Sequence, residues 1–236
     1  MSALIFDIET IGEDYEKLDE TTQGSLTRWI RREAQTEQEF EKALEDLKNG
    51  LGFSPLTGEI VAIGVLDSEK DSGAVYYQAP GENQKESDLD GIKLKPMAEK
   101  EMLEQFWKLC EKYQEFVSFN GMGFDVPFLM IRSAINNIKP SKNLMSNRYL
   151  GSQKFDAKHI DLLDQLSFYG AMRRRGNLHL WCRAFGIKSP KSEGVTGDDV
   201  GALFREKKYL EIAKYNVGDI KATRELFKYW RDYIKF

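Results

Sequence analysis

The stretch Leu4-Ile-Phe-Asp-Ile-Glu-Thr10 combines an apolar run with two acids that are separated by one residue. Its three apolar residues, 4–6, are typical of a buried strand, and they run directly into Asp7 and Glu9. Side chains two residues apart on a strand point to the same face of the sheet, so these two acids lie together. Because two buried carboxylates repel each other, the stretch predicts a compensating cation, either a Lys or Arg side chain or a metal ion.

The pattern Asp-x-Glu is by itself a weak signal in a chain with 38 acidic residues. It recurs at 14–16 and 67–69, both times in polar surroundings. Only the copy at 7–9 follows an apolar run, and this context makes a functional role for Asp7 and Glu9 the working hypothesis.

The composition is that of a globular protein. With 236 residues, 41% of them hydrophobic and 31% charged, we expect a single domain over 1–236. No apolar run is long enough to cross a membrane, and the N-terminus lacks the pattern of a signal peptide. Cys110 and Cys182 stand alone in apolar helical patterns, which indicates buried free thiols. These features favour a cytoplasmic protein that does not bind membranes.

The net charge of −4 is unevenly distributed. Residues 126–192 contain twelve Lys or Arg and three Asp, a local net charge of +9, so the remainder of the chain carries −13. This asymmetry fits a face that binds a polyanion such as nucleic acid. A merely solvated basic face is the alternative.

Hydrophobic periodicity and turn residues predict an α/β fold with a mixed central sheet flanked by helices. The charge-rich residues 13–50 are expected to form a helical insertion after the first strand. The other expected elements are strands at 60–66, 74–78 and 116–119, helices starting at Pro96 and near Pro127, helices over 177–185 and 207–233, loops at 81–95 and 191–199, and an apolar element at 160–168.

Two further acids occupy positions where functional residues gather. Asp125 follows a strand and a Gly-bearing turn, just before a helix, although it could serve only as the cap of that helix. Tyr215 and Asp219 are four residues apart in the final helix and therefore share a face. A solvated Asp219 beside Lys221 and Arg224 is the alternative.

Asp7, Glu9, Asp125 and Asp219 could converge at one end of the sheet. Four carboxylates without cationic partners would raise one another's pKa values, and two divalent ions would relieve the repulsion. A ligand set made only of oxygen suits Mg²⁺ or Mn²⁺. Two such ions roughly 4 Å apart stabilise the attacking and leaving oxygens of a phosphodiester. The Tyr215 hydroxyl could then orient the attacking water.

In this order, FDIET (6–10), NGMGFD (120–125) and YNVGD (215–219) resemble the three motifs of the DEDD superfamily of 3'-5' exonucleases, which has a ribonuclease H-like fold. Tyr215 makes the chain similar to the Tyr-type branch (DEDDy), since the His-type branch would have His in place of Lys214. NGMGFDVPFL looks most like the proofreading exonuclease domain of B-family DNA polymerases, in a stand-alone form. The motifs span nearly the whole chain.

The resemblance implies a reaction and the residues that perform it. Asp7, Glu9, Asp125 and Asp219 match the metal ligands, and Tyr215 matches the residue that positions water. The implied activity is metal-dependent hydrolysis of single-stranded nucleic acid from its 3' end, with two Mg²⁺ or Mn²⁺ as cofactors and nucleoside monophosphates as products. DNA is favoured over RNA as the substrate, with DNA repair as the expected setting.

Substrate contacts are expected beside these acids. The resemblance implies contacts from the backbone at Ile8 and Thr10 and from Asn120 and Phe124. The basic run Arg173, Arg174, Arg175 is expected to grip phosphates of the incoming strand.

Other polar and aromatic residues near these motifs receive less specific roles. Tyr169 is a candidate for stacking on bases, whereas core packing is favoured for Phe168 and Trp181. Asp161 is expected to be a structural, hydrogen-bonded acid, and the role of His159 stays open.

Two features depart from the family pattern, namely the long insertion at 13–50 and the lack of a polymerase domain, so a proofreading role is not implied. An inactive nucleic-acid-binding module on the same fold is the main alternative, and the presence of all four acids argues against it. An endonuclease would not require a free 3' end. A structural protein with unrelated acids would be insensitive to a chelator.

Overall fold

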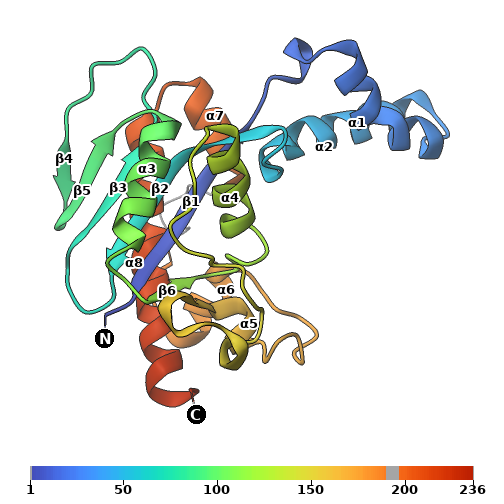
Figure 1. The fold of residues 1–236 in the computed structure, drawn as a ribbon. Helices are drawn as coiled ribbons and strands as arrows, with labels where there is room; N and C mark the ends of the chain where they lie inside the picture. Colours follow the sequence, from blue (N-terminus) through green and yellow to red (C-terminus); the bar gives the residue numbers. More distant parts are fainter. Residues whose placement is uncertain (1, 190–196, 236) are drawn as a thin grey trace.

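The computed structural model describes residues 2–189 and 197–235, and these contain a seven-stranded mixed sheet with helices on both faces (Figure 1). The strand order is β4-β5-β3-β2-β1-β6-β7. β1 pairs antiparallel with β2 and parallel with β6, so the first strand of the chain lies inside the sheet. The strands are β1 (Leu4–Gly12), β2 (Gly58–Asp67), β3 (Gly73–Tyr77), β4 (Ser87–Leu89), β5 (Ile92–Pro96), β6 (Glu115–Ser118) and β7 (Lys158–Asp161).

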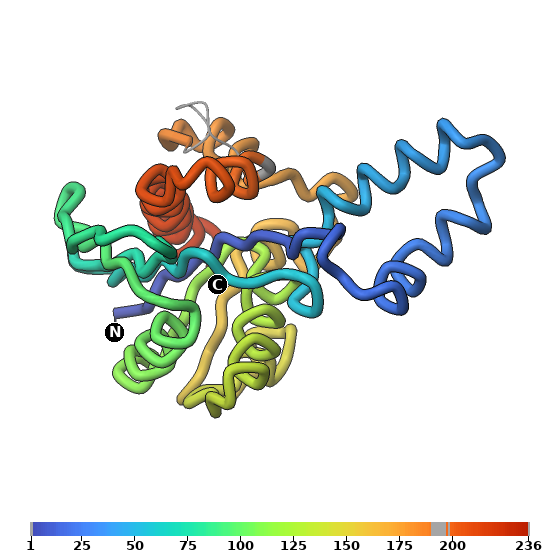
Figure 2. The backbone as a smooth tube through the Cα atoms, turned by 90° about the horizontal axis from the view of Figure 1, so that it is seen from above, coloured from blue at the N-terminus to red at the C-terminus, as the bar shows by residue number. Residues whose placement is uncertain are grey.

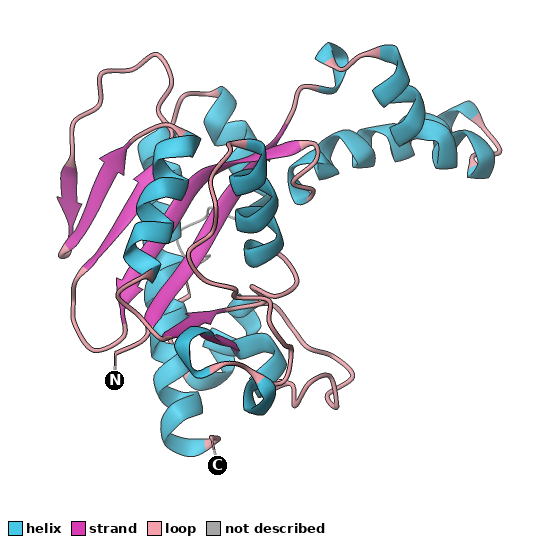
Figure 3. Ribbon diagram, in the orientation of Figure 1, coloured by secondary structure: helices cyan, strands magenta, loops and turns pink. Residues whose placement is uncertain are grey.

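Helices cover both faces of the sheet (Figure 3), and β1 carries apolar side chains on each face. Leu4, Phe6 and Ile8 pack into a core with α3 and α4, whereas Ile5 packs into a second core with α7 and α8. The helices are α1 (Glu20–Glu33), α2 (Glu37–Gly50), α3 (Glu99–Cys110), α4 (Asp125–Ile135), α5 (Leu162–Leu166), α6 (Leu178–Phe185), α7 (Val200–Arg205) and α8 (Tyr209–Tyr233). Across the described ranges, none of these helices has the length and apolar composition that spanning a bilayer requires.

The pairing between β1 and β6 is short, and this opens the sheet where the first motif lies. Only Leu4 and Ile5 pair with β6. Past Ile5, no strand among the described residues pairs with β1 on that side. A bulge between Glu9 and Thr10, where β2 contains the extra residue Val61, further twists the end of β1. The second half of β1 therefore has one edge available to side chains from elsewhere in the chain.

Residues 13–50 contain the expected helices. α1 and α2 form a hairpin that extends away from the sheet at the end of β1, as two views at right angles show (Figures 1 and 2). Each helix begins at a capping side chain, since Asp19 accepts the N–H of Thr22 and Thr36 accepts the N–H of Glu39. The chain returns to the sheet through the short 3-10 turn η2 (Leu51–Phe53).

The prediction for 81–96 was wrong. The expected loop contains the hairpin β4–β5, and Pro96 ends β5, whereas a helix was expected to start there. The helix α3 begins three residues later, where the Glu101 carboxylate accepts the N–H of Ala98. β4 has only three residues, so its alternation is too short to stand out from a polar loop.

The remaining elements agree closely with the expected ones. Gly186 ends α6 with φ +69°, a conformation that glycine adopts without strain. The apolar element at 160–168 divides at Asp161, which ends β7 and caps α5. Of the loop expected at 191–199, residues 191–196 lie outside the described residues, and Gly197–Asp199 forms a 3-10 turn before α7.

Candidate active site

Three carboxylates meet between β1 and α8. Asp7 and Glu9 share one face of β1, as their spacing predicts, and Asp219 approaches them from α8. One carboxylate oxygen from each of the three residues lies within 4.8 Å of the other two. Glu9 and Asp219 are buried, and Asp7 is partly exposed. Within 2–189 and 197–235, neither Asp7 nor Glu9 forms an ion pair, so a Lys or Arg side chain does not supply the expected cation there.

Asp125 joins these acids from the open edge of β1. It is the first residue of α4 and is buried, and its Oδ1 accepts the N–H of Ile8 at 3.0 Å. This N–H lies where β1 has diverged from β6, so the carboxylate takes the place of a strand partner. The capping alternative does not describe Asp125, because the cap position belongs to Phe124.

Asn216 is a residue of this site that sequence reasoning missed. It is completely buried on α8, and its Nδ2 donates to Oδ2 of Asp7 at 2.8 Å and to Oε1 of Glu9 at 3.4 Å. A signal was available in the motif YNVGD, since Asn216 stands three residues before Asp219 and so on the same side of the helix.

Burial and mutual repulsion raise the pKa values of three acids of the site. The pKa of Asp7 is well above its ordinary value because of burial and then the charges of Asp219, Asp125 and Glu9. The pKa of Glu9 is raised by burial and by Asp219, against the opposing effect of the bond from Asn216. Burial raises the pKa of Asp125 from 3.8 to about 7, although the N–H of Ile8 opposes the shift. Burial and like charges placed close together therefore both favour the neutral forms of these acids.

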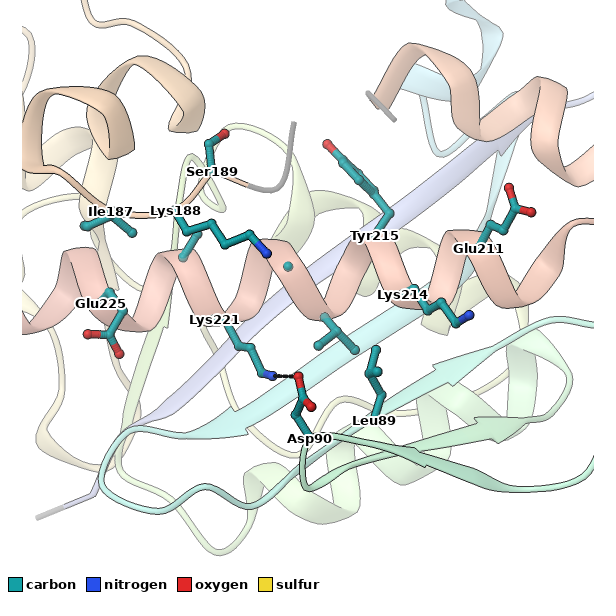
Figure 4. A pocket seen from close by; sticks show the side chains of 13 residues that line it. Leu89, Asp90, Ile187, Lys188, Ser189, Glu211, Lys214, Tyr215, Lys221 and Glu225 are labelled. Carbon is teal, nitrogen blue, oxygen red and sulfur yellow. Dashed lines mark hydrogen bonds and ion pairs between the residues drawn. The ribbon is translucent and has the colours of Figure 1, made fainter. Parts of the chain in front are cut away.

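Tyr215 lies half-buried one helical turn before Asp219. Burial, followed by the charges of Asp219, Glu9 and Asp7, raises the pKa of Tyr215 above its ordinary value of 10.0. The phenol is therefore protonated in neutral solution and can both donate and accept a hydrogen bond. Figure 4 shows its ring on the side of α8 opposite the ion pair between Lys221 and Asp90.

The turn before α4 is fixed by Asp161, which has the structural role expected of it. Its two carboxylate oxygens accept the N–H groups of Asn120 and Met122, each at 2.9 Å. Asn120 has a φ of +63°, a conformation that Asn tolerates better than most residues, and its side chain is exposed. These two bonds fix the turn that contains the predicted substrate contact Asn120 and leads into Asp125.

His159, whose role the sequence left open, is a structural residue. It is buried, with Nε2 at 2.7 Å from Oγ of Ser118 and Nδ1 at 3.1 Å from the carbonyl of Leu144. Burial lowers the pKa of His159 to about 4, so the ring is neutral at physiological pH.

The other predicted substrate residues lie beside the acids. The N–H of Ile8 is bonded to Asp125, and the hydroxyl of Thr10 donates to the carbonyl of Gly52 at 2.7 Å. The ring of Phe124 is partly buried and packs against Phe128, with 5.1 Å between ring centroids.

Arg173, Arg174 and Arg175 are exposed in the loop between α5 and α6. Nη1 of Arg175 lies 3.9 Å from Asp164, which is also bonded by both Nε and Nη2 of Arg148. No contact joins these three arginines to the acidic cluster among the described residues, so their role as phosphate contacts stays a prediction.

One aromatic residue of this region, Phe168, differs from expectation. Phe168 was expected in the core but is 55% exposed, because residues 168–170 all have positive φ and form a tight turn after α5. The hydroxyl of Tyr169 accepts hydrogen bonds from Gln165 and from the N–H of Leu150, which holds the ring against the protein. Trp181 is half-buried and packs against the core, as expected.

A cavity of about 470 Å³ lies along α8 beside this site (Figure 4). Its lining includes Leu89 and Asp90 from the β4–β5 turn, Ile187 before the end of the first described range, and Tyr215 of α8. Tyr215 lines this cavity, whereas none of the four acids does.

A mixed sheet with helices on both faces, and acids gathered at its open central strand, defines an α/β protein of the ribonuclease H-like class. A family model described as "Predicted 3'-5' exonuclease related to the exonuclease domain of PolB" matches residues 58–231, and the chain belongs to this family. The match begins at β2, so it includes Asp125, Tyr215 and Asp219 but excludes β1 and the helical insertion.

Solved structures support the same fold. The structure of the family B DNA polymerase from the hyperthermophilic archaeon Pyrobaculum calidifontis is similar, with a TM-score of 0.59 and 15% sequence identity over 98% of this chain. The chain spans 24% of the length of that polymerase chain. No curated protein matches the sequence.

Proposed function

We propose that this protein is a 3'-5' exonuclease that uses divalent metal ions to remove nucleoside monophosphates from the 3' end of single-stranded DNA. The observation that carries the proposal is the cluster of Asp7, Glu9 and Asp219, whose oxygens lie within 4.8 Å of one another. Membership of a family of predicted 3'-5' exonucleases supports the same reaction.

The residues present fit divalent cations. All the candidate ligands, Asp7, Glu9, Asp125 and Asp219, offer hard carboxylate oxygens, which suit Mg²⁺ or Mn²⁺. After burial, repulsion between neighbouring carboxylates contributes to the raised pKa values of three of them, and bound cations would relieve this repulsion. When bound, two such ions stabilise negative charge on the attacking and leaving oxygens of a phosphodiester.

The chain's own groups position the reactants. The four acids hold the cations, and Asn216 keeps Asp7 and Glu9 oriented through its amide. The protonated hydroxyl of Tyr215 orients the attacking water. In the hydrolysis, the water oxygen bonds to phosphorus and the bond from phosphorus to the 3' oxygen breaks. The shortened strand keeps a 3' hydroxyl, and a nucleoside 5'-monophosphate leaves.

The substrate strand is held outside the acids. Asn120 and Phe124 contact the terminal nucleotides, with the backbone at Ile8 and Thr10 near the 3' end. The arginines at 173–175 contact phosphates further along the strand. Phosphate contacts of this kind make binding weaken as salt concentration rises and give little sequence preference.

The proposal treats residues 1–236 as one exonuclease domain that contains the insertion 13–50. We place its activity in the cytoplasm, on free 3' ends of DNA, with DNA repair as the process it serves. Similarity to the exonuclease domain of DNA polymerases is the reason for preferring DNA over RNA.

The test follows a single-stranded DNA labelled at its 5' end, with Mg²⁺ or Mn²⁺. A ladder that shortens from the 3' end is expected, and Asp7→Asn should reduce its rate by a factor of about 100 or more, because it removes a charged metal ligand. The matched control is Asp14→Asn, from the second Asp-x-Glu copy, which should leave the rate unchanged. Binding without degradation would instead indicate an inactive nucleic-acid-binding module. A strand blocked at its 3' end would still be cut by an endonuclease, and an RNA strand tests the sugar preference.

A further inference from the structure

We propose that Phe53, in the turn η2 that leads from the helical insertion back to the sheet, forms a stacking site for a base of the single-stranded substrate together with Phe124. This inference rests on the proposed function, and it assigns the turn that follows the insertion a role in substrate binding. Phe53 lies outside the region that the family model matches.

The first observation is that a large apolar side chain remains in solvent at this point. Phe53 is 63% exposed, whereas Leu51, two residues earlier in the same turn, is buried. Its ring makes an edge contact with Phe124, with 6.4 Å between centroids and 65° between planes. Two aromatic rings at an angle, one exposed and one partly buried, present an open aromatic surface to solvent.

The second observation is that the turn carrying Phe53 is held rigidly against the strand of the acids. The carbonyl of Gly52 accepts the Thr10 hydroxyl at 2.7 Å, and the carbonyl of Leu51 accepts the Thr57 hydroxyl at 2.8 Å. Gly12 and Gly52 approach so closely that a Cβ on Gly52 would lie 2.9 Å from the Gly12 nitrogen. An exposed ring on such a frame loses little freedom when a ligand binds to it.

The third observation is the position of this frame relative to the acids. Thr10 follows Glu9 directly, and Phe124 precedes Asp125 directly. The Asp125 carboxylate is itself bonded to the N–H of Ile8, between Asp7 and Glu9. Phe53 therefore adjoins two of the three segments that carry acids of the site, namely β1, through the bond between Gly52 and Thr10, and α4, through Phe124. A strand whose 3' end lies at the acids passes this aromatic surface.

Nucleic-acid bases are the ligand class that this surface fits. Every base has an aromatic face, so stacking on Phe53 would be independent of sequence and would require an unpaired strand. A peptide ligand would call for hydrogen-bonding groups or a closed apolar groove, and the surface at Phe53 is a single exposed ring beside a second one.

The test compares Phe53→Ala with the wild type on a 5'-labelled single strand. We expect KM to rise about 5-fold or more with kcat within about 2-fold, and Phe53→Trp to retain the wild-type KM. A strand with abasic sites in its last three nucleotides should show no difference between the variants. Tyr233→Ala is the control, since it removes a 79% exposed ring about 21 Å along α8 from Asp219 and should change nothing. Equal KM values for wild type and Phe53→Ala, with unchanged melting temperature, would overturn the inference.

A binding measurement keeps this inference separate from the proposed activity. The anisotropy of a fluorescent oligothymidylate in chelator reports binding without hydrolysis. If no nuclease activity exists but Phe53→Ala weakens binding about 5-fold, the stacking site stands and the proposed function fails. If the enzyme is active and Phe53→Ala affects neither KM nor binding, the proposed function stands and the stacking site fails. If the wild type neither cuts nor binds the strand, both fail.

Discussion

Asn216 donates a hydrogen bond to Asp7 at 2.8 Å across 209 residues of sequence, and this contact joins the last helix to the first strand at the acidic cluster. The second contact of the same amide, to Glu9, makes Asn216 the one neutral group shown to bridge two acids of the described site. The amide is neutral, so it can bond to both carboxylates without neutralising their charge. A Lys in its place would compete with metal ions for these carboxylates. The carboxylates thus stay available to metal ions while their orientation is fixed.

Replacing Asn216 by Ala should weaken metal binding more than it weakens the fold. We expect the Mg²⁺ or Mn²⁺ concentration for half-maximal activity to rise about 10-fold, because groups that orient metal ligands typically have such effects. The control is Thr223→Val on the same helix, which removes a buried hydroxyl with no hydrogen-bond partner among the described residues. Unaltered metal dependence in Asn216→Ala would show that Asn216 only fills space.

Gly64 of β2 allows α8 to approach the sheet. A Cβ at this position would lie 2.0 Å from Oδ1 of Asn216 and 2.8 Å from Cγ2 of Ile220. Gly64→Ala should therefore lower the free energy of unfolding by about 1–3 kcal/mol and also reduce activity, because Asn216 must move. Gly24→Ala in α1, where a Cβ meets nothing within 4 Å, should be neutral or stabilising by up to about 1 kcal/mol. Urea unfolding measures the free energy of unfolding of both variants. Equal losses of stability would contradict the view that Gly64 is needed for the close approach of α8.

The acidic cluster should make the metal-free protein less stable as pH rises. The pKa of Asp125 is about 7 in the folded chain and 3.8 ordinarily, and the pKa values of Asp7 and Glu9 shift in the same direction. The folded state therefore holds more protons than the unfolded state above pH 3.8, and its stability falls until the pH passes the raised pKa values.

The measurement is Tm in chelator from about pH 7 to 8.5. His159 has the opposite effect on stability, because its pKa is lowered from 6.5 to about 4 in the folded chain. Its effect changes mainly below pH 6.5, so it adds little pH dependence in this window. We expect the Tm measured in chelator to fall as pH rises and to increase when Mg²⁺ or Mn²⁺ is added. In Asp7→Asn, the Tm should depend less on pH. A Tm in chelator that is independent of pH would argue against the raised pKa values.

An ion pair between the buried Glu99 and the partly buried Arg132 secures α4, which carries Asp125. Arg132 donates to both carboxylate oxygens of Glu99, at 2.8 and 2.7 Å, and Glu99 also accepts the N–H of Ile60. Arg132→Ala should cost about 3–5 kcal/mol, because it leaves a buried carboxylate without its cation. Lys17→Ala breaks the exposed pair with Asp14 and should cost less than about 1 kcal/mol. Thermal denaturation of the two variants provides the comparison, and similar losses would contradict this role.

The sequence predicted well what depends on short-range periodicity. The spacing of Asp7 and Glu9 places both on one face of β1, and that of Tyr215 and Asp219 places both on one side of α8. Gly186 ended its helix where expected. The β4–β5 hairpin and the exposure of Phe168 were missed, because three-residue strands and tight turns contain too few residues to show a period.

The amino-acid sequence by itself determined which acids are present, their order and the faces they occupy, because strand and helix periods fix these locally. Only the tertiary structure decided that Asp7, Glu9 and Asp219 converge, since this depends on how closely α8 packs on β1 and β2. The absence of a side chain at Gly64 permits that approach, and Asn216 bridges the gap. Such distances are set by packing between segments far apart in the chain, and no local pattern records them.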